Sequence, residues 1–249
     1  MEIQSEIDGR PKGSFGRYLA LTRNRAKLFA KLNELVKPFA NFDTADSIYF
    51  PQGEQFPKEA KLGDTEGLLT LDQRETVTSW WLAVRRGANT PNWDIAAKCS
   101  ILGKPGLILV EAKAHKQELD FTGIRAGNSE NKERITEAVS EANCWLNAKW
   151  PVWNLSVESK YRLSNRFAWS WKLASLGVPV ILVYLGFLNA EEMKPNGKLF
   201  STPAGWDQAV RDYSKGVIPD DVWGPSIEVN GTPFLSLIRS CEQSLPADS

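Results

Sequence analysis

The sequence predicts an α/β protein in which a mixed central sheet is flanked by helices, with extensions at both ends of the chain. Three observations support this class. Amphipathic helical patterns alternate with short apolar strand patterns between residues 67 and 188. Gly and Pro separate these segments. The apolar run 178–188, "VPVILVYLGFL", is about half the length of a membrane span and is interpreted as a buried strand.

Composition limits the possible classes of protein. The 249 residues are 42% hydrophobic and 24% charged, and thirty acidic residues balance thirty basic ones. No global basic excess therefore indicates a nucleic-acid partner. Basic residues are concentrated in 17–37, 85–116 and 149–172, which are either solvated faces or a combined surface for a polyanion. Three widely spaced cysteines and the lack of a predicted signal or membrane span lead us to expect a cytoplasmic protein.

The first elements are predicted from apolar spacing and helix-end signals. A helix is expected over about 16–37, where a proline stops it. A polar, turn-rich connection follows over 40–66. Thr70 and Gln73 form a capping-box pattern that starts a second helix, which ends near Gly87.

The later elements follow from the same signals. They are a hairpin joined through "LGKPG" (91–115), helices over 129–149 and about 158–176, a strand over 178–188, and short helices near 203–215 and 233–243. We therefore divide the chain into an N-terminal helix with a connecting extension (1–66), an α/β core (67–190) and a C-terminal extension (191–249).

Charges at unusual positions mark the hairpin. Side chains alternate between the two faces of a strand. If Leu102 pairs with Leu107, Asp94 on the first strand shares a face with Glu111 and Lys113 on the second, whereas a one-residue slip would separate them. The alternative is an edge strand whose charges prevent aggregation.

Two carboxylates and one ammonium on one face suit metal-assisted hydrolysis. Mg²⁺ prefers oxygen ligands, which Asp94, Glu111 and the backbone carbonyl of Ala112 would supply. Lys113 would orient or deprotonate the attacking water. The acid-x-Lys pattern itself is weak, because it occurs five times, including at Glu59. Only the copy at Glu111 closes an apolar strand and follows a strand that carries an Asp.

This arrangement, with a helix before it and a helix–strand unit after it, resembles the PD-(D/E)XK nuclease superfamily over about 67–188. The resemblance implies a restriction-endonuclease-like core, metal binding by Asp94 and Glu111, and catalysis by Lys113. The proline of the motif name does not adjoin the Asp, since the closest one is Pro91.

Each of the remaining candidate site residues has a structural explanation as well as a functional one. Glu75 is either a supporting acid or a first-turn acid favoured by the helix dipole. His115, the only histidine, could contact phosphate or act as a base, although it could also be incidental. Arg162, Asn165 and Arg166 share one helix side, which is either a nucleic-acid contact or a solvated face.

The sequence therefore predicts a nuclease dependent on Mg²⁺ or Mn²⁺, with DNA as the expected substrate and no membrane association. A nucleic-acid- or protein-binding module that keeps the fold without activity is the first alternative. A metal-dependent hydrolase of another phosphoester is the second. The sequence gives no prediction of the oligomeric state.

Overall fold

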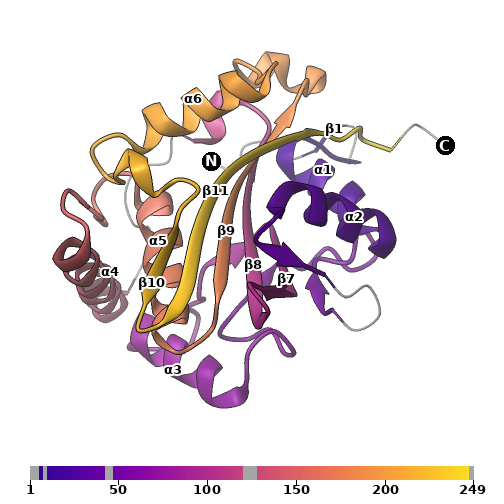
Figure 1. Cartoon of the computed structure of the whole chain (residues 1–249). Helices are drawn as coiled ribbons and strands as arrows, with labels where there is room; N and C mark the ends of the chain where they lie inside the picture. Colours follow the sequence, from indigo (N-terminus) through magenta and orange to yellow (C-terminus); the bar gives the residue numbers. More distant parts are fainter. Residues whose placement is uncertain (1–5, 8–9, 43–46, 120–127, 247–249) are drawn as a thin grey trace.

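The computed structural model describes residues 6–7, 10–42, 47–119 and 128–246. Within these residues the chain forms a seven-stranded mixed sheet in the order β10-β11-β9-β8-β7-β3, with β4 also paired to β7 (Figure 1). Its strands are β3 (Ala40–Asn41), β4 (Tyr49–Phe50), β7 (Ile95–Ile101), β8 (Lys104–Lys113), β9 (Val180–Leu188), β10 (Ser226–Val229) and β11 (Thr232–Glu242). Strands β8, β9 and β11 are parallel neighbours, and the other pairs are antiparallel.

Helices cover both faces of this sheet, which confirms the predicted α/β class (Figure 1). One face packs against α1 (Gly13–Thr22) and α2 (Arg25–Val36). The other packs against α3 (Leu71–Trp81), α4 (Ser129–Lys149), α5 (Tyr161–Ser175) and α6 (Pro203–Ser214). None of the helices in the described ranges has the length and hydropathy needed to cross a bilayer.

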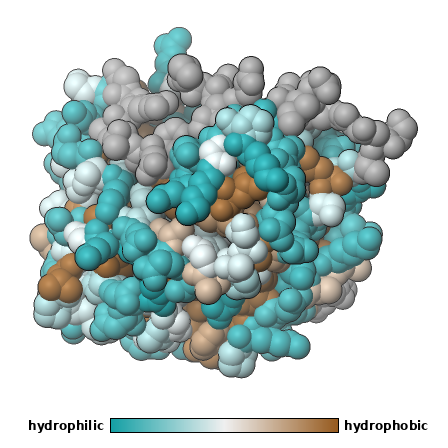
Figure 2. Space-filling model, turned by 90° about the horizontal axis from the view of Figure 1, so that it is seen from above, coloured by the Kyte–Doolittle hydropathy of each residue, from teal (hydrophilic) through white to brown (hydrophobic). Residues whose placement is uncertain are grey.

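Shorter elements complete the fold. They are β1 (Glu6–Ile7), β2 (Arg10–Pro11), β5 (Ala60–Lys61), β6 (Asn92–Trp93) and the 3-10 turns Lys116–Glu118, Glu191–Asn196 and Asp220–Val222. At the α6 end of the molecule, the surface is mostly hydrophilic with apolar areas between the polar side chains (Figure 2). A cavity of about 250 Å³ beyond β9 and β11 is lined partly by the acids Glu191, Glu192 and Glu242.

Several predicted elements are confirmed. The helix over 129–149 and the capping box at Thr70 are both present. The helix expected over 16–37 is instead two helices, because the first ends at Thr22 and Asn24 caps the start of the second. The helix that begins after Thr70 ends at Trp81, before the predicted stop at Gly87.

The prediction of a short helix near 233–243 is wrong, because this segment is strand β11. Its apolar residues have a spacing that fits a helical stripe, but β11 lies between β9 and β10 and is buried on both faces. A strand buried on both faces shows no simple alternation. The signal that would have identified it is Asn230–Gly231, where both residues have positive φ and form a two-residue hairpin turn.

The turn between β7 and β8 also differs from the prediction. Ile101 pairs with Lys104, so the turn contains only Leu102 and Gly103. Lys98, rather than Leu102, pairs with Leu107. The register therefore differs by four residues. This is an even number, which leaves the side chains on their predicted faces.

Leu102 has the positive φ of 49° in this turn and an exposed side chain. Because asparagine tolerates the left-handed region better than leucine, Leu102→Asn is expected to raise the free energy of unfolding by about 1 kcal/mol. Urea denaturation measures the change. Leu71→Asn is the matched control, since it removes an exposed leucine from regular helix and should give no gain. Equal effects of the two substitutions would contradict the explanation.

Candidate active site

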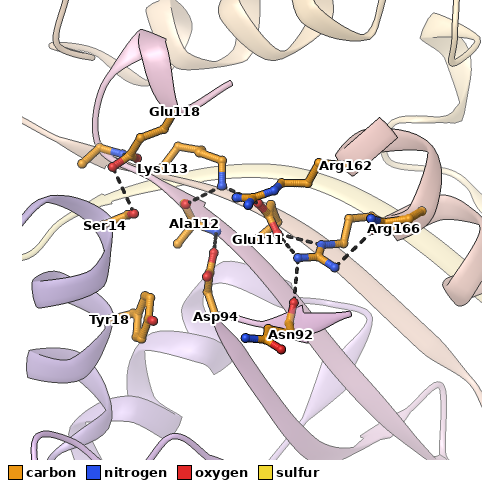
Figure 3. Close-up of polar contacts among 12 residues, drawn as sticks. Ser14, Tyr18, Asn92, Asp94, Glu111, Ala112, Lys113, Glu118, Arg162 and Arg166 are labelled. Carbon is orange, nitrogen blue, oxygen red and sulfur yellow. Dashed lines mark hydrogen bonds and ion pairs between the residues drawn. The ribbon is translucent and has the colours of Figure 1, made fainter. Parts of the chain in front are cut away.

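The candidate site lies along β8 where its pairing with β7 ends at Val110. Beyond that point, two carboxylates accept backbone N–H groups, one within β8 and one from the residue that follows it. The N–H of Ala112 donates to Asp94 Oδ2 at 2.6 Å, and the N–H of Ala114 donates to Glu118 Oε2 at 2.6 Å. This edge of β8 is thus held by acidic side chains, and the peptide after Glu111 lies next to Asp94 (Figure 3).

Asp94 reaches this edge because the chain breaks between β6 and β7. Strand alternation through this segment would place Trp93 and Ile95 on one face, but Trp93 packs with the core under α3–α5 and Ile95 with the core under α1 and α2. Asp94 lies at the break, outside both strands. Its carboxylate accepts the Ala112 N–H, as the carbonyl of a neighbouring strand would. The Asp94 side chain therefore ends at the backbone of β8 and does not point along the Glu111 side chain (Figure 3).

Glu111 is buried and surrounded by three cationic side chains. Lys113 Nζ donates to Glu111 Oε1 and, at 2.9 Å, to the carbonyl of Ala112. Arg166 Nε donates to Glu111 Oε2 at 2.7 Å, and Arg162 Nη1 donates to Oε1 at 3.3 Å. The two arginines reach the same carboxylate because they lie four residues apart on α5.

Arg166 also connects Glu111 to the segment that carries Asp94. Its Nη2 donates to the carbonyl of Asn92 at 2.7 Å, and its guanidinium lies 4.4 Å from the centre of the Trp93 ring. The side chain is only 6% exposed. A buried, planar group with these contacts fixes the spacing between β6 and β8.

The pKa values of the Asp94 and Glu111 carboxyl groups shift in opposite directions. Burial alone would raise the pKa of Glu111, but the charges of Arg166, Lys113 and Arg162 outweigh it and hold the pKa well below its usual range. Burial, followed by the charge of Glu111, raises the pKa of Asp94 to about 7, although Lys113 opposes this. Glu111 is therefore always charged near neutral pH, whereas Asp94 can gain or lose a proton.

A third acid, which the sequence pattern does not predict, lies next to this pair. Ala60 pairs with Trp93 across β5 and β6, and the same register places Glu59 opposite Asp94. Tyr18 Oη donates to Glu59 Oε1, and Asn92 Nδ2 donates to Glu59 Oε2 at 2.8 Å. The acid-x-Lys copy at Glu59 lies in the segment where the sequence predicts a turn-rich connection and no strand. Only the tertiary pairing of β5 with β6 brings it to Asp94.

The other predicted residues lie in different surroundings. Glu75 is exposed on α3. His115 is buried, with Nε2 at 3.5 Å from Glu118 Oε1 and Nδ1 at 3.3 Å from Gln117 Oε1. Asn165 and Arg166 are buried, whereas the Arg162 side chain is 42% exposed. Of the three α5 residues, Arg162 therefore offers the most surface to solvent.

The donor atoms suit a hard divalent cation. Glu111 Oε1 and the Ala112 carbonyl contact the same ammonium, so both face a point that a cation can reach. Among the described residues, no three or more Asp, Glu, His or Cys side chains form a metal-binding group. Mg²⁺ needs only one or two carboxylates, since water and substrate oxygens complete its shell. Comparisons with protein-family models, curated proteins and solved structures find no match to this chain.

Proposed function

We propose that this protein is a Mg²⁺- or Mn²⁺-dependent nuclease that hydrolyses phosphodiester bonds, with DNA as substrate. The observation that carries the proposal is the gathering of Asp94, Glu111, the Ala112 carbonyl and the Lys113 ammonium around residue Ala112 of β8. These groups combine oxygen ligands for a hard cation with a positive charge for phosphate.

Asp94, Glu111 and the Ala112 carbonyl would hold the metal ion, which when bound would lower the pKa of water and offset charge on the phosphate. In the reaction, the oxygen of a water forms a bond to phosphorus and one phosphorus–oxygen ester bond breaks. The water loses a proton and the departing oxygen gains one, which leaves a phosphomonoester and an alcohol. Lys113 would orient the water and stabilise the developing negative charge.

The arrangement of the core supports the resemblance to PD-(D/E)XK nucleases. Helix α3 precedes the antiparallel hairpin of β7 and β8, and the long connection through α4 and α5 leads to β9, parallel to β8. Asp94 lies just before the first strand of the hairpin, and Glu111 and Lys113 lie at the end of the second. Strand β11 adds a further parallel neighbour from the C-terminal segment.

The test is cleavage of supercoiled, linear duplex and single-stranded DNA with Mg²⁺, Mn²⁺ or EDTA. We expect metal-dependent cleavage of at least one form. Lys113→Met should reduce the rate about 10²–10³-fold, because it removes the charge beside the phosphate. Lys98→Met, at an exposed lysine of β7, is the matched control and should cleave like the wild type. Cleavage that survives EDTA or Lys113→Met would refute the proposed mechanism.

One observation favours the alternative of an inactive binding module. Arg166 satisfies Glu111 Oε2 through two guanidinium nitrogens, so an internal cation already neutralises the proposed ligand. In that case the protein would bind nucleic acid or protein without turnover, and Mg²⁺ would not change its melting temperature. A hydrolase of another phosphoester would instead cleave small phosphoesters but leave every DNA form intact.

A further inference from the structure

The hydroxyl of Tyr184 is a buried polar group that the proposed metal site does not use. Tyr184 is 1% exposed, and among the described residues its hydroxyl has no hydrogen-bond partner. An unsatisfied buried donor of this kind has an energetic cost and calls for an explanation. Proteins retain such groups where a ligand or a bound water completes them.

The position of Tyr184 points to the candidate site. Tyr184 is the direct neighbour of Glu111 across the parallel pair β8–β9, on the sheet face that packs against α5. Burial, then the charges of Glu111 and Tyr213, raise the pKa of its hydroxyl, while Arg166 and Arg162 lower it. The hydroxyl is thus protonated at neutral pH and lies within electrostatic range of the arginines that hold Glu111.

The residue is held rigidly in this position. Trp206 Nε1 donates to the Tyr184 carbonyl at 3.2 Å, and the Trp223 ring packs edge-on at 5.5 Å from the Tyr184 ring. Gly186, two residues along β9, allows the Trp206 ring to lie directly over the strand, since an added Cβ would be 2.5 Å from it. A donor fixed in this way loses little entropy on binding a ligand.

The charge around Glu111 favours an anion as that ligand. Lys113, Arg162 and Arg166 place three positive charges against the single carboxylate of Glu111. With Asp94 counted as charged as well, the three cations still outnumber these two carboxylates by one. The 42% exposure of the Arg162 side chain gives solvent a route to this side of the cluster.

We propose that Tyr184, Arg162 and Lys113 form a subsite for a phosphate group, in which the Tyr184 hydroxyl donates a hydrogen bond to a phosphate oxygen. The subsite deepens the proposed function, because it would hold the phosphodiester that is cleaved. It adds to the site a strand residue outside the Asp94–Lys113 hairpin. It also gives the buried hydroxyl a partner.

The test is Tyr184→Phe, which removes only the hydroxyl. We expect the melting temperature to stay equal or rise, because an unsatisfied buried group is lost. DNA cleavage should nevertheless fall about 10- to 100-fold, as expected for a hydrogen bond to a charged group. Inorganic phosphate, compared with chloride at equal ionic strength and without metal, should raise the melting temperature of the wild type but much less that of Tyr184→Phe.

Tyr49→Phe is the matched control, because Tyr49 is a buried tyrosine in the core on the opposite sheet face. It should keep both cleavage and the response to phosphate. If Tyr184→Phe also keeps both, the hydroxyl holds at most a water and the subsite is refuted while the nuclease proposal stands. If the wild type cleaves no DNA but responds to phosphate through Tyr184, the subsite stands and the nuclease proposal fails. No cleavage together with no phosphate response refutes both.

Discussion

Replacing Glu111 with alanine is expected to lower the free energy of unfolding by about 3–5 kcal/mol. The substitution would leave Lys113 and Arg166 buried without their counter-ion, and Arg162 would lose its contact as well. A loss of this size is a large part of the roughly 5–15 kcal/mol that stabilises a typical protein. Urea denaturation in EDTA measures the loss without a contribution from metal binding.

Glu75→Ala is the matched control, because Glu75 is an exposed glutamate and its loss should change stability by less than about 0.5 kcal/mol. A loss of under about 1 kcal/mol for Glu111→Ala would mean that the cationic cluster does not depend on this carboxylate. The practical consequence is that loss of activity in Glu111→Ala cannot by itself assign a catalytic role. Lys113→Met is the cleaner variant, because Glu111 keeps both arginines.

The pH dependence of stability provides a second measurement of the same cluster. The pKa of Glu111 is lower in the folded protein than its ordinary value. Its ion pairs therefore stabilise the fold above the ordinary pKa of about 4.3, and this contribution is lost as the pH falls toward the folded pKa. Glu111→Gln should be less stable than the wild type at pH 7, and the difference should shrink on acidification below pH 4.

Strand alternation predicted which residues lie near the site, but it did not predict how all of their side chains are oriented. The faces of Glu111 and Lys113 followed from local periodicity, and an even register shift left them unchanged. The orientation of Asp94 did not follow, because periodicity assumes a continuous strand and the chain breaks at this residue. An unbroken strand in the observed register would have paired Asp94 with Glu111 on one face, whereas its carboxylate instead accepts the Ala112 N–H.

The partners of the site could not be predicted from local patterns. Glu59 depends on the pairing of β5 with β6, and Tyr184 on the parallel pairing of β8 with β9. Both pairings join segments that are far apart in sequence. Helical spacing predicts that the two arginines share one side of α5, but their contact with Glu111 is a product of packing. Helical spacing identifies residues on one side of a helix, without showing whether that side contacts solvent or a carboxylate.

Asp94→Asn is expected to abolish most metal-dependent cleavage and yet stabilise the metal-free protein. The amide keeps the size of the side chain and can still accept the Ala112 N–H, but it lacks the negative charge that a divalent cation requires. We expect cleavage to fall about 10²–10³-fold. In EDTA at pH 8 the variant should melt a few degrees above the wild type, since each kcal/mol corresponds to about 2–4 °C for a chain of this size.

The sign of the stability effect follows from the raised pKa of Asp94, about 7 in the folded protein. A raised carboxyl pKa stabilises the fold below its ordinary value of about 4, and this contribution is lost as the pH rises through about 7. The advantage of Asp94→Asn should therefore be large at pH 8 and nearly absent at pH 4. Magnesium should reverse the order at pH 8, because a ligand at 100 times its dissociation constant adds about 2.7 kcal/mol to the wild type only. Equal stabilisation of both proteins by Mg²⁺ would place the metal elsewhere and remove Asp94 from the proposed site.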